Sequence, residues 1–275
     1  MGQNPLQQYF RQPKVYVGLP SMGVYNKPGT IQGDSSNMPI YGMTGMDEIL
    51  MKTPDALMAR ETTVKIIESC CPSIKDGWDV SGLDIDLLLV AIRIATYGNT
   101  LEIAHVCDQC KTDNEYSVQL SPLIDYFSNF QYKNVITLKD LTIKLQPLTY
   151  RQTTNYSLRN FTIQQQLTQA ARIENREEQS ATIANLFLDL SKLQNEIFTD
   201  SIDSVQFNNS VVSEKSYIKE WLENCDSSFF DEIKNQINQV RDSLQMPPFD
   251  VKCENCGYET KISIDLDQSS FFAKA

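Results

Sequence analysis

Four of the seven cysteines lie in two short motifs whose spacing suits the binding of one metal ion. The first motif reads VCDQCK and contains Cys107 and Cys110, and the second reads KCENCG and contains Cys253 and Cys256. The tight turn of a C-x2-C motif holds both thiolates on one side, and a structural zinc ion takes four such ligands in tetrahedral geometry. The sequence therefore predicts a closed zinc-ribbon site, in which Zn²⁺ has a structural role and no coordination position is left for a substrate.

Two other interpretations of these cysteines are two unconnected redox motifs and four thiols without metal. A redox C-x2-C motif normally opens a helix after a strand, whereas both motifs here are followed by the alternating pattern of a strand. The zinc interpretation is therefore favoured, although residues 111 to 252 far exceed the usual linker of about 12 to 20 residues between zinc-binding pairs. One shared ion would make the intervening segment an insertion whose two ends are clamped by the metal.

The remaining candidates for metal or thiol chemistry are weaker. His105, the only histidine, lies two residues before Cys107 on the same strand face. It is a conceivable substitute ligand, but four cysteines already complete the site, so a supporting or surface role is expected. Cys70, Cys71 and Cys225 are expected to pack as small hydrophobic residues.

The first motif is expected to lie after a helical segment and between two short strands. Thr44 with Asp47 forms a capping-box pattern, and Thr53 followed by Pro54 predicts the start of a second helix that runs to about Cys70. The stretch SGLDIDLLLVAIRIATYGN predicts an amphipathic helix that ends at Gly98. The segments LEIAHV and EYSVQL then predict strands on either side of the first cysteine pair.

The second motif is expected to follow a long helical region. Ser121 and Pro122 predict the start of a small helix, and VITLKDLTIKLQPL predicts a hairpin that turns near Lys139 and Asp140. Residues 150 to 245 predict three or four helices, with breaks near NREEQS, QFNNS and CDSS, and MPPFD ends the last helix because paired prolines cannot continue it.

These patterns predict a mainly helical α+β protein with a split four-cysteine zinc-ribbon module, a β-hairpin and an extended N-terminal arm. The expected divisions are the arm (1–43), a helical segment (44–98), the first zinc knuckle with the hairpin (99–149), the helical insertion (150–245), and the second knuckle with a C-terminal strand (246–275).

The first 43 residues are interrupted every few positions by proline or glycine, which disrupts both helical and strand periodicity. Hydrophobic residues are spaced along the segment, so it is expected to lie on a surface. An extended arm that docks on partner proteins and a terminus wrapped over its own domain are the two alternatives. For the first alternative the candidate partner-binding residues are Tyr9, Phe10, Val15, Tyr16, Tyr25 and Tyr41.

Composition narrows the classes of function. The net charge of −11 argues against a surface that binds the phosphate backbone, so no nucleic acid is expected as the main partner. No stretch approaches the roughly 20 apolar residues of a membrane span, and the first residues lack the features of a signal peptide. The protein is therefore expected in a cytosol with reduced cysteines. No phosphate-binding loop, dinucleotide motif or H-E-x-x-H motif occurs, and one histidine beside a metal knuckle is a poor general base, so no enzyme is predicted.

Several stretches, taken in order, resemble one protein family. They read LPSMGVYNKPG, MPIYGMTGMDEILMKTPDALM, ESCCPSI, LDIDLLLVAIRIATYG, CDQC and LKDLTIKLQPLTYRQ. Together they are similar to the baseplate hub subunits and hub assembly proteins of T-even-like, contractile-tailed bacteriophages. The resemblance covers about residues 15 to 152, and TGMDEILMKTPDALM and AIRIATYG are its most specific parts. The first knuckle lacks the proline expected after Cys107, and the arm before residue 15 and the helical insertion are departures from the family pattern.

The resemblance implies a non-enzymatic virion or assembly component of the tail baseplate, made in the cytoplasm of the bacterial host, with the baseplate of the virion as its location. It implies other hub or tail-tube proteins as partners, and a homo-oligomer in the virion is compatible with it. A zinc-ribbon protein associated with nucleic acid or transcription is the alternative, but the residues around both knuckles balance acids against lysines. A thiol oxidoreductase is a third hypothesis and would require reducible cysteine pairs.

Overall fold

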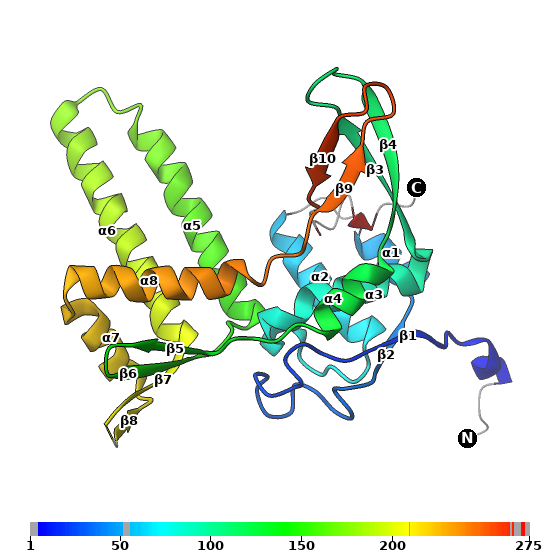
Figure 1. Ribbon diagram of the computed structural model, residues 1–275, viewed down its shortest axis with the longest axis horizontal. Helices are drawn as coiled ribbons and strands as arrows, with labels where there is room; N and C mark the ends of the chain where they lie inside the picture. The colour runs from blue at the N-terminus through cyan, green and yellow to red at the C-terminus, as the bar shows by residue number, and fades with distance from the viewer. Residues whose placement is uncertain (1–4, 52–55, 209, 265, 267–270, 273–275) are drawn as a thin grey trace. The chain divides into compact units, whose positions relative to one another are not determined.

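The computed structural model describes residues 5–51, 56–208, 210–264, 266 and 271–272. The chain divides into two compact units. Unit 1 consists of Met1–Gln131 together with Met246–Ala275, and unit 2 is the continuous segment Tyr132–Gln245. The fold is α+β, with many helices and small antiparallel sheets, which confirms the predicted class (Figure 1). No helix within the described ranges has the length and apolar character needed to cross a membrane.

Unit 1 combines short helices with paired strands. Its helices are α1 (Gly45–Met51), α2 (Ala56–Cys70), α3 (Gly82–Tyr97) and α4 (Ser121–Ser128), with the 3-10 turns η1 (Pro5–Tyr9) and η2 (Gly77–Asp79). Its described strands form three antiparallel pairs: β1 (Pro13–Val17) with β2 (Met38–Tyr41), β3 (Thr100–Val106) with β4 (Asp113–Gln119), and β9 (Phe249–Lys252) with β10 (Glu259–Ile262).

Helix α3 is the centre of the unit 1 core. The Ser81 side chain caps its first turn by accepting a hydrogen bond from the Leu83 N–H at 3.3 Å, and Gly98 ends it with φ +93°. Most of its side chains are buried, and it contacts β1, β2, α2 and α4. The boundaries predicted from the capping residues and the apolar periodicity are therefore confirmed.

Residues 13–43 pack against their own unit, which agrees with the second alternative for the N-terminal segment. Strand β1 pairs with β2, and Val17, Met38 and Ile40 are almost completely buried. Hydrogen bonds to a buried carboxylate fix the loop between the two strands. The buried Asp84 carboxylate accepts hydrogen bonds from the Ser21 N–H at 2.9 Å and from the Ser21 hydroxyl at 2.6 Å. Burying these apolar side chains is more favourable than leaving them on a free arm.

The start of the helical segment also follows the prediction where it is described. The Thr44 hydroxyl accepts from the Asp47 N–H at 3.2 Å, and the Asp47 carboxylate accepts from the Thr44 N–H at 2.7 Å, which completes the capping box. The predicted helix start at Thr53 and Pro54 lies outside the described residues. Helix α2 ends at Cys70, where burial raises the pKa of the Cys70 thiol to about 12, so this thiol is an inert packing group.

Unit 2 contains four described helices and one antiparallel sheet. The helices are α5 (Tyr150–Ala170), α6 (Arg176–Ser201), α7 (Lys215–Asn224) and α8 (Ser227–Asp242). The sheet has the strand order β5 (Val135–Leu138), β6 (Leu141–Leu145), β7 (Ile202–Phe207) and β8 (Ser210–Val212). The predicted hairpin is therefore β5–β6, but it belongs to unit 2 rather than to the first knuckle. Strand β7 pairs with β6 across a large sequence separation, so unit 2 begins at Tyr132 instead of residue 150.

One hydrophobic cluster holds the helices of unit 2 against its sheet. The buried members come from the strands, the end of α6, and α7 and α8, and they are Ile136, Leu138, Ile143, Leu145, Phe198, Ile202, Val205, Ile218, Leu222, Ile233 and Ile237. Phe198 packs edge-to-face on Phe230 with ring centroids 5.9 Å apart. Unit 2 therefore has a core formed entirely from one continuous segment of the chain.

Candidate metal centre

The two cysteine motifs form two knuckles with the same backbone path at the ends of two hairpins of unit 1. One knuckle joins β3 to β4 and the other joins β9 to β10 (Figure 1). In each, the N–H of the first cysteine donates to the carbonyl five residues on, at 2.9 Å for Cys107 and 2.8 Å for Cys253. The carbonyl of the same cysteine accepts from the N–H four residues on, at 2.9 Å in both. That N–H donor, which directly follows the second cysteine, has a left-handed backbone in both knuckles, with φ +58° at Lys111 and +73° at Gly257.

The knuckles bring all four cysteine sulfurs together although the motifs are far apart in the chain. The Sγ atoms of Cys107 and Cys256 are 3.7 Å apart, and those of Cys110 and Cys253 are 3.6 Å apart. All four sulfurs lie within 4.8 Å of one another. Cys107 and Cys253 are buried, Cys110 is half-buried and Cys256 is exposed. The cluster therefore lies at the edge of the unit, with two sulfurs turned inward.

This arrangement fits a tetrahedral ion. Zinc–sulfur bonds of about 2.3 Å place any two of four tetrahedral sulfurs about 3.8 Å apart, close to both distances between the knuckles. The all-sulfur donor set suits zinc or iron and disfavours the hard cations Mg²⁺ and Ca²⁺. The four cysteines can thus hold one metal ion, and a metal with four protein ligands would join the two hairpins without offering a position for a reaction.

The electrostatics of the cluster also favour a cation. The Thr112 hydroxyl, followed by the Thr112 N–H, stabilises the thiolate and lowers the pKa of Cys110 to about 5. The N–H of Tyr258 favours a thiolate at Cys256, but desolvation and the three neighbouring sulfurs outweigh it and raise the pKa of Cys256 to about 12. Without a cation, four thiols at these distances cannot all ionise, because each thiolate charge disfavours the ionisation of its neighbours. A bound divalent cation stabilises the thiolates and removes this opposition.

Polar side chains next to the cysteines bridge the two knuckles. The Asn114 carbonyl oxygen accepts a hydrogen bond from the Glu254 N–H at 3.2 Å, and the Asn255 amide donates to the Thr112 hydroxyl at 3.0 Å. Asn114 is buried and also donates to the Thr112 carbonyl at 2.8 Å. The sequence interpretation did not assign these residues. The sequence signal for them is weak: Thr112 and Asn114 are polar residues shortly after Cys110, and Asn255 lies between the two cysteines of the second motif.

His105 does not belong to the sulfur cluster. It lies opposite Asn114 in the β3–β4 register and is half-buried. Its Nε2 atom is buried and has no hydrogen-bond partner among the described residues. Tyr116 lies on the same hairpin, and its hydroxyl is also buried, with no hydrogen-bond partner in the part of the chain that the structure describes. Burial, followed by the charges of Cys253 and Cys107, raises the pKa of Tyr116.

The candidate partner-binding residues of the N-terminal segment have different exposure. Tyr9, Phe10 and Tyr16 are exposed, with 76%, 56% and 55% of their surface accessible. Val15, Tyr25 and Tyr41 are half-buried, and the Arg11 guanidinium lies 5.7 Å from the centroid of the Tyr41 ring. The first three residues therefore retain the exposure that a partner contact requires, and the other three contribute to the packing of unit 1.

Fold and site together define an α+β protein with a four-cysteine centre that joins two distant parts of the chain. The sequence profile of the family described as "T4 bacteriophage base plate protein" matches residues 43–273. The chain therefore belongs to this family of phage baseplate proteins. No curated protein and no solved structure matches the chain.

Proposed function

We propose that the chain is a non-enzymatic component of the hub of a contractile-tail baseplate, where it acts in structure or assembly through contacts with other proteins. It is made in the cytoplasm of the bacterial host and acts at the tail baseplate, either as a permanent subunit of the virion or as an assembly factor that leaves. Family membership supports the baseplate part of this proposal. The resemblance of residues 15 to 152 to hub subunits and hub assembly proteins supports the more specific hub role.

The main observation in support of a structural metal site is that the four cysteine sulfurs lie within 4.8 Å of one another. We propose Zn²⁺ as the metal, held by Cys107, Cys110, Cys253 and Cys256. The ion would fix the β3–β4 hairpin to the β9–β10 hairpin. The chain leaves unit 1 after Gln131 and returns at Met246, so these hairpins lie on either side of the inserted unit in the sequence. The metal would therefore join the two segments of unit 1 that the insertion separates in the sequence.

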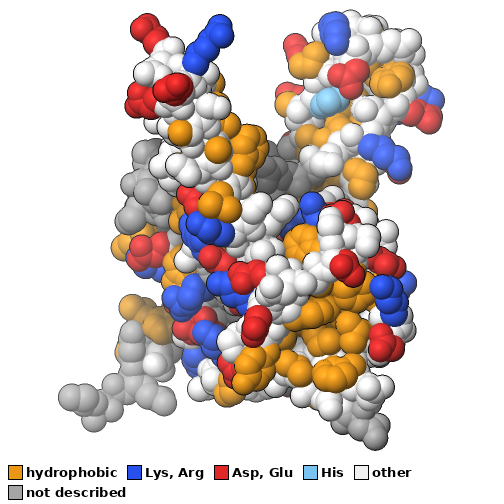
Figure 2. Space-filling view, turned by 90° about the vertical axis from the view of Figure 1, so that its left-hand side faces the viewer, with side chains coloured by type: hydrophobic (Ala, Val, Ile, Leu, Met, Phe, Trp, Pro, Cys, Tyr) orange, Lys and Arg blue, Asp and Glu red, His pale blue; other side chains and the backbone are white. Residues whose placement is uncertain are grey.

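Protein partners are the proposed ligands of this component. Tyr9, Phe10 and Tyr16 present exposed aromatic surface on the N-terminal segment, and aromatic residues supply much of the binding energy at protein interfaces. On the face shown in Figure 2, lysine and arginine side chains lie among aspartate and glutamate side chains. Such a mixed surface suits protein contacts better than the phosphate backbone of a nucleic acid.

Two measurements test the proposal. Elemental analysis of the purified full-length chain is expected to give one zinc per chain, and Cys253→Ser is expected to abolish stoichiometric metal while Cys225→Ser keeps it. Metal bound equally well by the Cys253→Ser variant would contradict the site.

The baseplate role is tested in the phage itself. A phage that lacks the gene is expected to produce tails without functional baseplates, and cross-linking in infected cells is expected to join this chain to hub or tail-tube proteins. Mass spectrometry of purified virions then separates a permanent subunit, present at stoichiometric level, from an assembly factor that leaves. Normal baseplates in the absence of the gene would overturn the proposed role.

A further inference from the structure

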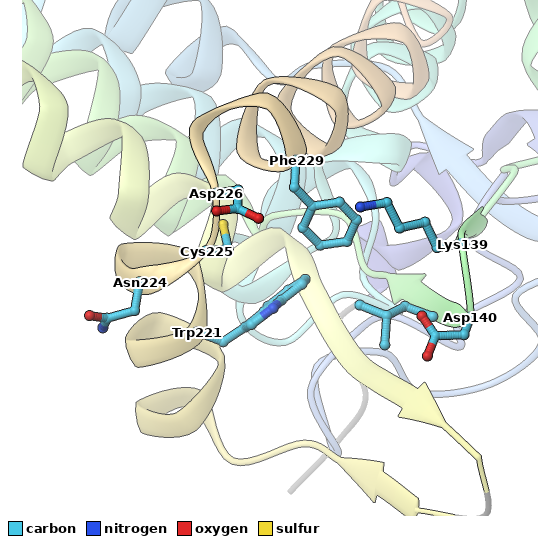
Figure 3. A pocket seen from close by; sticks show the side chains of 8 residues that line it. Lys139, Asp140, Trp221, Asn224, Cys225, Asp226 and Phe229 are labelled. Atoms are coloured by element: carbon cyan, nitrogen blue, oxygen red, sulfur yellow. The ribbon is translucent and has the colours of Figure 1, made fainter.

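A pocket of about 380 Å³ lies within unit 2, between the turn of the β5–β6 hairpin and the corner that joins α7 to α8. Trp221, near the end of α7, and Phe229, in the first turn of α8, line it together with Lys139 and Asp140 from the hairpin turn and Asp226 from the corner. Figure 3 shows the two aromatic rings facing the hollow and Lys139 reaching toward Phe229. The volume is at the lower end of the range of about 300 to 1,000 Å³ for small-ligand pockets, which suits one large side chain.

The aromatic wall of the pocket already binds a cation. Trp221 and Phe229 pack edge-to-face with ring centroids 6.1 Å apart. The Lys139 ammonium lies 4.8 Å from the centroid of the Phe229 ring, within the distance of about 6 Å at which a cation is attracted to a ring face. The chain's own lysine therefore shows that this wall accepts a positive charge.

The charges around the pocket favour another cation over an anion. Asp226 precedes α8, but its side chain makes no capping hydrogen bond, and Asp140 is exposed at the hairpin turn. Among the described residues neither carboxylate is part of an ion pair, so the lining carries two negative charges against the single positive charge of Lys139. The N-terminus of α8 would normally attract an anion, but the Asp226 carboxylate already supplies negative charge there.

We propose that this pocket binds an arginine side chain presented by a partner protein. The planar guanidinium group stacks on aromatic faces and pairs with carboxylates, which are the two kinds of group that the pocket offers. Arginine is also enriched among the residues that dominate binding energy at protein interfaces. The inference stands on unit 2 alone, so it depends on neither the metal site nor the baseplate assignment.

Lys139 has a defined part in this proposal. Its ammonium covers one aromatic face and adds a positive charge next to the binding position, so it competes with the incoming guanidinium. Replacing it with the neutral Gln should therefore strengthen the binding of arginine. An anion-binding pocket would behave in the opposite way, because Lys139 would be its main attractive charge.

The test uses the intrinsic fluorescence of Trp221 in the full-length chain. Trp78→Phe removes the only other tryptophan, so the signal of this variant reports on the pocket. The probes are N-acetyl-arginine amide and its uncharged counterpart N-acetyl-citrulline amide, which has nearly the same shape. A saturable change with the arginine probe, in the millimolar range, and none with the citrulline probe is the expected result.

Four further substitutions in the Trp78→Phe background sharpen the result. Asp226→Asn and Asp140→Asn are each expected to weaken binding about threefold, the size of an exposed charge interaction, and Lys139→Gln to strengthen it by a similar factor. Asp189→Asn, on the exposed surface of α6, is the matched control and should leave binding unchanged. An equal response to citrulline, a loss of affinity in Lys139→Gln, or unchanged affinity in both Asp226→Asn and Asp140→Asn would overturn the proposal.

Discussion

The two units of this chain reach a folded state in different ways. Unit 2 is one continuous segment with a hydrophobic cluster formed from its own strands and helices. Unit 1 is assembled from both ends of the chain, and its two late strands contact the early hairpin through the sulfur cluster and the bonds of Asn114 and Asn255. Unit 2 is therefore held together by apolar burial, whereas the two hairpins of unit 1 meet at hydrogen bonds and at a sulfur cluster that can hold a metal ion.

This difference follows from how little apolar surface the two hairpins of unit 1 can bury. Each is a two-stranded sheet, and an isolated two-stranded hairpin is only marginally stable in water. A bound metal ion would supply the stability that so little apolar burial cannot provide, as in other small β modules. The two units should consequently respond in opposite ways to metal removal and to the loss of a core side chain.

Removing the metal is expected to have the largest effect, and only on unit 1. Apparent zinc affinities of about 10 to 16 kcal/mol in small modules are comparable with the whole stability of a domain, about 5 to 15 kcal/mol. Chelation, or Cys253→Ser, should therefore raise amide hydrogen exchange in β3, β4, β9 and β10 to nearly unprotected rates. Protection of the unit 2 core should remain. Equal loss of protection in both units would show that they do not fold independently, and Cys225→Ser is the thiol control that should change neither.

The complementary change is Phe198→Ala in unit 2. It is expected to lower the free energy of unfolding of this unit by about 4 kcal/mol, because it leaves a cavity among fully buried side chains. Phe198 is 2% exposed and packs against Phe230. Denaturant unfolding followed by hydrogen exchange should show the loss in β6, β7 and α8, while the metal content stays at one ion per chain. Phe187→Ala, on the exposed side of the same helix, is the matched control, because surface substitutions usually stay within about 0.5 kcal/mol. A drop in metal occupancy in the Phe198→Ala variant would instead show that the stability of unit 2 affects metal binding in unit 1.

The features that were predicted correctly from the sequence are those set by local chemistry. The extent of α3 follows from Ser81 and Gly98, and the capping box of α1 follows from Thr44 and Asp47. The turn geometry of C-x2-C is also local, because it needs only the residues of each knuckle. That the two knuckles meet was inferred from ligand number alone, since tetrahedral zinc requires four ligands.

The features that were not predicted depend on contacts between distant residues. Strand β7 is short and lies inside a region of helical pattern, and its partner β6 precedes two long helices, so no local signal shows the pairing. Asp84 has the sequence position of an ordinary acid in the first turn of a helix. Its burial becomes visible only when the loop containing Ser21 folds over it. The pocket beside Trp221 likewise requires the hairpin turn and the α7–α8 corner to meet.

Asp84 gives unit 1 a pH dependence that unit 2 should lack. Burial raises the pKa of Asp84 to about 6 from 3.8, although the hydrogen bonds from Ser21 and Asn26 oppose the shift. The Asp84 carboxyl group therefore binds its proton more tightly in the folded state than in the unfolded state. The resulting stabilisation is complete below pH 3.8 and is lost as the pH rises through about 6. Its size is of the order of 3 kcal/mol, since one pKa unit corresponds to about 1.4 kcal/mol.

The measurement compares the free energy of unfolding of unit 1 in the wild-type chain and in Asp84→Asn between pH 4.5 and 7.5. The wild type should lose stability relative to the variant as the pH rises, and the difference cancels the titration of all other groups. The unfolding of unit 2 should show the same pH profile in both proteins. Parallel profiles in unit 1 would mean that Asp84 does not change its protonation on folding in this range.

The smallest expected effect comes from the glycine that distinguishes the second knuckle from the first. Gly257 adopts φ +73° where the first knuckle has Lys111 at +58°. A Cβ added at Gly257 would meet only the end of the Lys252 side chain, 3.6 Å away, so Gly257→Ala introduces backbone strain without a clash. Left-handed conformation costs a residue with a Cβ roughly 1 kcal/mol, and the variant should lower the stability of the metal-bound module by about that amount. Gly45→Ala, in the first turn of α1 with open space around it, should be neutral or slightly stabilising.

Competition for zinc with a chelator measures both variants. A loss in Gly257→Ala as large as that in Cys253→Ser would show that this turn, and not only the sulfurs, determines whether the knuckle forms.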